Sequence, residues 1–208
     1  MKKYILLGLC LLFYFSGSAQ PEFTAEASQL FTSFKFKDSQ GEKHNGDYQS
    51  IITSGYGIGM RYVTGGGIAF RAGIGLRNGG ANLVYDNNNY DWKLQYLDLK
   101  LGAGYMLQFK NIKPYVMVLG YYGSLLRGTQ TLNNENFNIT KSGILKNRDF
   151  GLQFNPGLNI KVNHFISTYI EFQYLMGLAN LEVNPPQESK NTAFGATLGF
   201  SFLLEEKN

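Results

Sequence analysis

The feature that most constrains this chain is a two-residue alternation of bulky apolar and small side chains. From residue 194 to residue 202, alternate positions hold Phe, Ala and Leu, and the positions between them hold Gly, Thr and Ser. Successive side chains of a β-strand point to opposite faces, so this pattern predicts a strand with one bulky apolar face and one small face. The same alternation recurs at residues 55–62 and 68–77. The chain is therefore expected to build most of its structure from strands of one kind.

The first residues indicate that the chain is exported. Two lysines precede an apolar stretch at residues 4–15, and residues 17–19 are small. This order is typical of a secretory signal peptide, and the apolar stretch is too short to span a bilayer as a helix. We predict a signal peptide at residues 1–19 and one mature domain at residues 20–208.

Composition excludes several classes of chemistry. Cys10 is the only cysteine and lies in the signal peptide, so the mature chain has no disulfide, thiolate metal site or cysteine nucleophile. Without Lys2 and Lys3, 17 basic residues face 15 acidic ones, a balance that does not indicate nucleic-acid binding. His44 and His164 have no metal-ligand partner at a useful spacing. We therefore predict no nucleic-acid partner, no cofactor, no metal site and no catalytic residues.

The alternating faces favour a barrel in a membrane. Charged residues make up 16% of the chain, glycines number 25, and no mature run of 18 apolar residues exists. A spanning strand needs only about 10 alternating residues, so a membrane barrel remains possible where a spanning helix does not. A soluble barrel of lipocalin type would show the same period with its faces reversed. The polar face here consists of small residues with few charges, which suits a crowded interior better than a solvated exterior.

We place eight strands along the mature chain, with short and long connections in alternation. The strands are expected at residues 28–37, 49–63, 67–77, 92–109, 113–127, 149–162, 165–179 and 192–204. The long connections are expected at residues 38–48, 78–91, 128–148 and 180–191, all at one rim and extracellular. The predicted fold class is therefore all-β, an eight-stranded antiparallel up-and-down transmembrane β-barrel of the outer membrane.

Two of these strands depart from simple alternation. Trp92, Leu94 and Tyr96 run in the opposite phase to the apolar residues that begin at Leu97, which suggests a β-bulge or a rise above the membrane. The strand at residues 113–127 is apolar on both faces, so its register stays unassigned.

Seven charged residues fall on the small, inward face. They are Arg61, Arg71, Arg77, Asp98, Lys100, Lys161 and Glu171. An eight-stranded barrel has room inside for side chains but not for an open channel, and an isolated buried charge is very unfavourable. We therefore predict an internal network of ion pairs and hydrogen bonds, with a polar pathway or gate as the alternative.

Two further groups of apolar residues invite assignment. Aromatic residues near the predicted strand ends are interpreted as interfacial girdles, namely Tyr62, Phe70, Trp92, Tyr105, Phe109, Tyr115 and Phe150. The loop at residues 128–148 carries four apolar side chains among polar ones, which are Phe137, Ile139, Ile144 and Leu145. Exposed apolar groups in a polar loop suggest an extracellular contact site, whereas a loop packed over the barrel mouth would show the same residues.

Several segments resemble a known family. They are SGYGIGMRYVTGGGIAFRAGIGLRNGGA (54–81), LDLKLGAGYM (97–106), KPYVMVLGYYGSLL (113–126), DFGLQFNPGLNI (149–160) and YIEFQYLMGLANL (169–181). This pattern is similar to that of the PorT-like outer-membrane β-barrel family of Bacteroidota, an OmpA/OmpX-like eight-stranded barrel domain. The resemblance implies the same fold and location. The family's namesake belongs to the type IX secretion and gliding apparatus.

Two functional hypotheses remain at this stage. The first is a non-enzymatic outer-membrane barrel that acts as a structural or partner-docking component of the cell envelope, or as an accessory subunit of a secretion or other outer-membrane machine. Its partners would be outer-membrane lipid, the barrel-insertion machinery that reads the C-terminal strand, and proteins of such a complex. The alternative is a lipid- or envelope-modifying enzyme, for which the sequence shows no G-x-S-x-G motif and no suitably spaced His and Ser.

Overall fold

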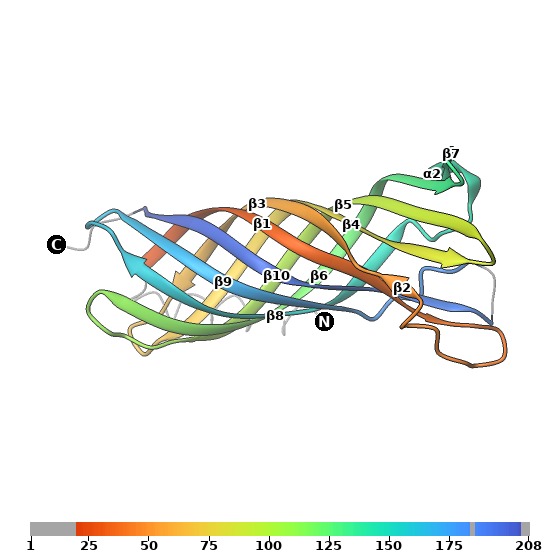
Figure 1. The fold of residues 1–208 in the computed structure, drawn as a ribbon. Coiled ribbons are helices and arrows are strands. Elements are labelled where there is room, and N and C mark those ends of the chain that lie inside the picture. Colours follow the sequence, from red (N-terminus) through yellow and green to blue (C-terminus); the bar gives the residue numbers. More distant parts are fainter. Residues whose placement is uncertain (1–19, 184–185, 205–208) are drawn as a thin grey trace, which may run out of the picture.

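Within the described part of the chain, residues 20–183 and 186–204 of a computed structural model, eight long antiparallel strands surround a common axis (Figure 1). They are β1 (Gln20–Lys37), β3 (Ile51–Val63), β4 (Ile68–Tyr85), β5 (Asn88–Met106), β6 (Ile112–Leu132), β8 (Arg148–Lys161), β9 (Ile166–Gly177) and β10 (Glu188–Leu203). Three short elements accompany them: β2 (Tyr48–Gln49), β7 (Glu135–Asn138) and the helix α2 (Ile139–Ser142). The predicted signal peptide lies outside the described residues.

The long strands form a closed ring. Each pairs with its neighbours in sequence order, and the first strand pairs with the last, so that Phe31 lies opposite Phe194 with the two rings stacked 5.1 Å apart. Closure gives every long strand two partners and removes the free edges that a lipid environment does not tolerate. The predicted eight-stranded antiparallel barrel is confirmed.

The two faces of each strand meet different surroundings. Large aliphatic and aromatic side chains cover the outer wall, where Leu101 is 70% exposed and Ile58 and Phe200 are also exposed. Their neighbours in sequence point inward, and many of these are small or polar, as the buried Thr197 and Ser201 show. An apolar outer wall around a polar interior is the arrangement of a barrel in lipid, and it is the reverse of a soluble lipocalin-like barrel.

The barrel has two different rims. Tight turns at residues 64–67, 107–111 and 162–165 lie at one end, together with the start of β1, where Gln20 pairs with Val63, and the end of β10, where Leu203 pairs with Glu22. We call this end the short-turn rim, and the opposite end the long-loop rim (Figure 1). Among the described residues, no helix is long and apolar enough to cross a membrane, a finding that does not bear on crossing by strands.

Several strands are longer than the sequence pattern indicates. Residues 78–91, expected to form a long loop, are a hairpin in which β4 and β5 continue to a two-residue turn at Asp86 and Asn87. Both turn residues have positive φ, of 49° and 58°, as a tight hairpin turn requires and as Asp and Asn tolerate. The loop prediction was wrong because polar strands that rise beyond the lipid no longer need the alternating pattern.

The expected loop at residues 128–148 also contains regular structure. β6 continues to Leu132 and forms a second hairpin with β7 across Asn133 and Asn134, both at positive φ. The helix α2 follows, where the Asn138 side chain accepts a hydrogen bond from the Thr140 amide, and it ends at Gly143 with a φ of 69°. Only the last part of this segment, up to β8, is irregular.

The structure assigns the register of β6. Tyr115, Met117, Leu119 and Tyr121 of this strand point into the barrel and are buried. The pairing of β6 with β5 shifts between Gln95 and Tyr96, near the place where the sequence suggested a β-bulge, but the extra residue, Leu126, lies on β6 and not on β5. β5 keeps its phase through this point, because Leu94, Tyr96 and Asp98 are all buried inside. The inward-facing side chains of β5 thus change from polar at Asp98 to apolar at Tyr96 and Leu94. This change explains why the apolar residues of the sequence seem to move from one face of the strand to the other.

Candidate functional site

An ion-pair network fills the middle of the barrel around Arg71. Its guanidinium contacts the carboxylates of Glu26 on β1 and Glu171 on β9, and donates to the Tyr169 hydroxyl at 3.0 Å. Lys100 lies 3.0 Å from the other oxygen of Glu26. Glu171 also accepts hydrogen bonds of 2.6 Å from the Tyr115 hydroxyl and the Asn155 amide. Each carboxylate is therefore paired with a cation and further satisfied by neutral donors, as buried charge requires.

A second cluster lies nearer the long-loop rim around Arg77. Its Nε donates to Asp98 at 2.7 Å, and its Nη2 donates to Asp149 at 2.9 Å. Asp149 accepts two more hydrogen bonds, from the Asn191 amide at 2.8 Å and the Tyr121 hydroxyl at 3.2 Å. Side chains of five strands, β4, β5, β6, β8 and β10, thus meet in this cluster, which ties opposite walls of the barrel together.

A third group of interior hydrogen bonds surrounds Arg61, close to the short-turn rim. Arg61 donates to Glu22 at 2.6 Å, to Asn159 at 2.7 Å and to Ser201 at 3.1 Å. The charged set formed by the three arginines with Lys100, Glu22, Glu26, Asp98, Asp149 and Glu171 is nearly balanced, with four cations and five carboxylates. This balance keeps the net charge inside the wall small.

Tyrosine rings lie against the arginines. The Arg77 guanidinium carbon is 4.6 Å from the centre of the Tyr96 ring and 5.0 Å from that of Tyr121, and Arg71 lies 5.2 Å from the Tyr169 ring. Cation–π contacts of this kind are strongest when desolvated. A cavity between the Arg71 and Arg77 groups has a volume of about 10 Å³, the space of a single water.

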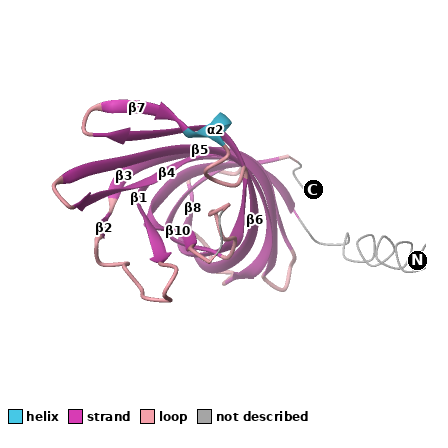
Figure 2. Ribbon diagram, turned by 90° about the vertical axis from the view of Figure 1, so that its right-hand side faces the viewer, coloured by secondary structure: helices cyan, strands magenta, loops and turns pink. Residues whose placement is uncertain are grey.

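The long-loop rim is closed by an apolar cluster. Leu181, Leu145 and Ile139 are buried there together with side chains of the barrel wall, namely Phe34, Ala81, Leu94, Tyr96 and Leu125. Leu145 and Glu182 form an isolated β-bridge, which joins the segment before β8 to the segment after β9. Figure 2 looks into this rim and shows loops lying across the centre of the ring. We call this cluster the mouth plug.

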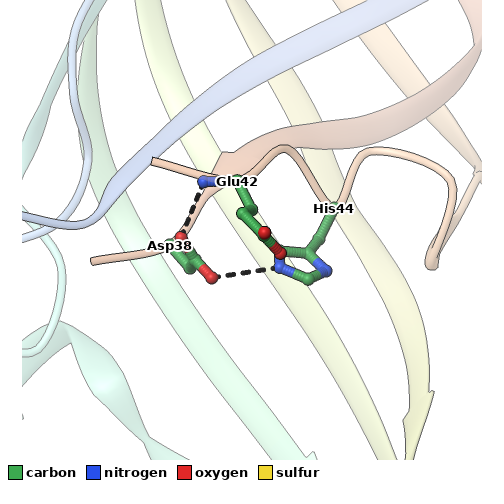
Figure 3. Close-up of side chains that lie close together, drawn as sticks. All are labelled: Asp38, Glu42 and His44. Atoms are coloured by element: carbon green, nitrogen blue, oxygen red, sulfur yellow. Dashed lines mark hydrogen bonds and ion pairs between the residues drawn. The ribbon is translucent and has the colours of Figure 1, made fainter. Parts of the chain in front are cut away.

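A separate group of polar side chains lies in the loop between β1 and β2. Figure 3 shows Asp38, Glu42 and His44, whose nearest ligand atoms lie within 4.8 Å of one another. One Asp38 oxygen accepts from the Gln40 and Glu42 amides at 2.9 and 2.8 Å. His44 joins two carboxylates, with Nε2 at 3.2 Å from Asp38 and Nδ1 at 3.1 Å from Asp47. We call this arrangement the His44 clasp.

The clasp gathers residue types that bind divalent metals, but its geometry is that of a hydrogen-bonded loop. Direct metal ligands lie about 2 Å from the ion, and a ligating imidazole must offer a free nitrogen lone pair. Both nitrogens of His44 face carboxylates at hydrogen-bond distance. Sequence spacing gave no sign of this grouping, because a loop rather than a helix or strand brings residues 38, 42, 44 and 47 together.

Comparison with known proteins identifies the family. Residues 15–182 match the family described as "Outer membrane protein beta-barrel domain". The chain belongs to this family. Among solved structures it is similar to Neisserial surface protein A, with a TM-score of 0.54 at 14% identity over 89% of this chain and 98% of that one. It is also similar to OprG of Pseudomonas aeruginosa, with a TM-score of 0.52 at 12% identity over 91% of this chain and 99% of that one. A search of curated protein sequences gave no match.

Membership in the family gives the barrel a direction in the outer membrane. In such proteins the short turns and both chain ends face the periplasm, and the longer loops face the outside. The short-turn rim of this outer-membrane barrel is therefore periplasmic. The mouth plug, the His44 clasp and the two hairpin tips are extracellular.

The structure places six of the seven predicted interior charges inside the barrel, in the contacts described above. Lys161 is the exception, because it is exposed at the periplasmic rim, where it lines a polar hollow with Glu22, Lys113 and Asn159. Its position at the end of β8 puts it beyond the enclosed part of the interior. Sequence reasoning missed Glu22, Glu26 and Asp149 as partners. The first two were missed because β1 begins at Gln20, eight residues before the expected start at residue 28.

The four predicted contact residues of the 128–148 segment divide into two pairs. Ile139 is 1% exposed and Leu145 is also buried, since both belong to the mouth plug, so their assignment to an exposed contact site was wrong. Phe137 and Ile144 are 46% and 49% exposed. The girdle assignment was also wrong for Tyr115, which is buried inside, and for Trp92, which packs against the mouth plug.

The His44 clasp lies outside the membrane-spanning strands and should respond to pH. Hydrogen bonds to Asp38 and Asp47 raise the pKa of the imidazole above its ordinary 6.5. Partial desolvation would raise the pKa of Asp38, but hydrogen bonds from the Glu42 amide and His44 outweigh it and lower that pKa. A histidine whose pKa is higher in the folded loop than in the unfolded chain stabilises the loop. This contribution is complete at pH values below the ordinary histidine pKa, and it is lost as the pH rises through the folded-state pKa.

We therefore expect the His44 ring signals of the barrel in detergent micelles to titrate with a midpoint above 6.5, measured by NMR. Asp47→Asn removes a partner of Nδ1 and should lower that midpoint, as should Asp38→Asn for Nε2. Amide protection in residues 38–48, corrected for the intrinsic pH dependence of exchange, should fall as the imidazole deprotonates. A midpoint unchanged by both substitutions would contradict the clasp.

Proposed function

We propose that this outer-membrane barrel is a non-enzymatic structural component of the cell envelope that docks a protein partner at its extracellular rim. The observation that carries this proposal is the filled interior. Ion pairs occupy the middle of the barrel, and the mouth plug covers its outer end. A barrel built in this way supports what it displays outside and does not conduct through its centre.

The extracellular hairpins supply the surface for docking. The β4–β5 hairpin carries Tyr85 at 67% exposure beside exposed Val84, and the β6–β7 hairpin carries exposed Phe137. Figures 1 and 2 show both hairpins projecting beyond the ring of the barrel. Exposed apolar side chains on rigid, paired strands above the lipid are suited to bind a protein surface.

We propose further that the chain is a PorT-like barrel of Bacteroidota and that its partner belongs to a secretion or other outer-membrane machine. This step is supported by the strand segments quoted from the sequence and by the Lys113-Pro114-Tyr115 entry to β6. In the fold Tyr115 points inward and its hydroxyl donates a hydrogen bond to Glu171. The role of this tripeptide is therefore to pack the barrel interior.

Two measurements test the proposed function. In planar lipid bilayers the purified barrel is expected to show no steady ion conductance, with a trimeric porin as the positive control. In living cells, a photo-crosslinking amino acid in place of Tyr85 or Phe137 is expected to yield a discrete protein adduct. The same probe at Leu101 on the lipid face should not. Steady open-channel conductance would overturn the filled-barrel argument, and adduct patterns identical at Tyr85 and Leu101 would overturn docking by the hairpins.

A further inference from the structure

A hollow of about 580 Å³ opens at the extracellular rim, between the loop that follows β1 and the β4–β5 hairpin. It borders the mouth plug through Tyr48 and Trp92 and shares no lining residue with the interior network. The His44 clasp forms one side of this hollow, and the aromatic side chains of β2, β4 and β5 form the other. Its position outside the membrane makes it accessible to molecules in the surrounding medium.

Aromatic rings hold one another in place along one wall of the hollow. The Tyr90 and Trp92 rings stack with centres 5.7 Å apart, and Trp92 contacts Tyr48 at 5.8 Å. Tyr48 in turn contacts Phe36 at 5.5 Å, while Tyr85 completes the wall from the hairpin tip. Rings fixed by mutual packing form a preorganised surface, which lowers the entropy lost when a ligand binds.

The charge of the hollow is acidic. Asp38 and Asp47 line it, and no lysine or arginine is among the described residues that do so. His44 lies between the two carboxylates and can offset one of them when it is protonated. Bound phosphate or sulfate would be repelled by this lining, whereas a cation would be attracted.

Aromatic faces combined with carboxylates select a particular kind of cation. The π-face of Trp or Tyr attracts ammonium groups, most strongly when the cation sheds its water easily, as an alkylated ammonium does. A bare divalent metal instead requires several oxygen ligands at about 2.0–2.6 Å, which an open hollow of this width does not supply. The volume is large enough for a small organic molecule.

We propose that this hollow binds a small organic ammonium ion of the choline type. Its cationic head lies against the rings of Tyr90, Trp92 and Tyr85, and Asp38 and Asp47 supply the opposite charge. The inference does not depend on the proposed docking function, because the hollow and its lining are present whatever protein binds the hairpin tips.

Trp92 gives a direct signal for the test, because it is the only tryptophan in the sequence. The barrel is purified in dodecyl maltoside, which carries no ammonium group, and titrated with choline chloride to roughly 50 mM, a range that covers millimolar affinities. We expect a saturable change in tryptophan fluorescence and a matching heat of binding. The neutral isostere 3,3-dimethyl-1-butanol should give neither.

Titration with phosphocholine tests whether the ligand is a free ammonium ion or the headgroup of a lipid. Because its phosphate would approach two carboxylates, it is expected to bind more weakly than choline. Tighter binding of phosphocholine would contradict the charge argument and overturn the proposal. So would equal binding of the neutral isostere, or no binding of choline to the folded barrel.

Variants locate the site. Tyr85→Leu changes an exposed hairpin residue and leaves the packed rings intact, and it should weaken choline binding several-fold. Tyr90→Leu removes the ring stacked on Trp92 and should weaken it about tenfold. Phe137→Leu on the other hairpin is the matched control and should leave the affinity unchanged. Equal affinity in Tyr85→Leu, Tyr90→Leu and the control would place binding elsewhere and overturn the proposal.

Discussion

Replacing Arg71 with leucine is expected to lower the free energy of unfolding of the barrel by about 3–5 kcal/mol. The substitution leaves Glu26 and Glu171 without the guanidinium that lies between them. Lys100 still faces Glu26, but Glu171 keeps only neutral donors. A carboxylate that has lost its cation in the enclosed interior must either stay charged and poorly solvated or take up a proton, and both are unfavourable.

Equilibrium unfolding in urea, with the barrel in lipid vesicles and circular dichroism as the signal, measures this loss. Lys161→Leu is the matched control, because Lys161 is exposed at the periplasmic rim and its loss should change stability by no more than about 0.5 kcal/mol. Arg71→Leu combined with Glu171→Leu removes the cation together with one carboxylate and should recover part of the loss. If Arg71→Leu were as stable as Lys161→Leu, the network would not be what holds the interior together.

The barrel itself could be predicted because lipid imposes a rule on every residue of a spanning strand. A residue such as Leu198 must be apolar where it meets lipid, and Thr197 beside it must be small where the interior is crowded, so the period of two appears directly in the sequence. The same parity placed Arg61, Arg71 and Arg77 inside. The alternation could not predict which carboxylate each arginine would contact, since that depends on the register between strands far apart in the chain.

The extracellular end could not be predicted in this way, because no single solvent acts on it. Above the lipid both faces of a strand can be polar, so the β4–β5 hairpin lost its alternation and was taken for a loop. Inside the mouth the opposite occurs, and Leu94 and Tyr96 are apolar because they pack on Leu145 and Leu181. The His44 clasp depends on loop backbone, for which residue spacing carries no periodic signal.

Replacing Gly199 with alanine is expected to lower the free energy of unfolding by about 2–3 kcal/mol. Gly199 is buried on the inner face of β10, and a Cβ there would lie 2.2 Å from Cζ of the Tyr169 ring. That ring cannot simply move aside, because its hydroxyl bonds Arg71 and Glu26 and its face packs on guanidinium groups. The methyl group therefore displaces a ring that the ion-pair network holds, and the strain is shared between them.

Gly120→Ala is the matched control, because Gly120 is exposed on the outer wall of β6 and its added Cβ would lie 3.7 Å from the nearest atom, the Leu101 carbonyl oxygen. Its effect should be within about 0.5 kcal/mol. A double-mutant cycle then isolates the cause: in a Tyr169→Leu background, Gly199→Ala should lose most of its effect, since the smaller side chain leaves room for the methyl group. Equal losses at the two glycines, or a Gly199→Ala effect that persists without the ring, would mean that backbone freedom and not the tyrosine requires glycine here. The expected coupling instead means that the inner face of β10 is small because the Tyr169 ring, which packs on the arginines, occupies the space beside it.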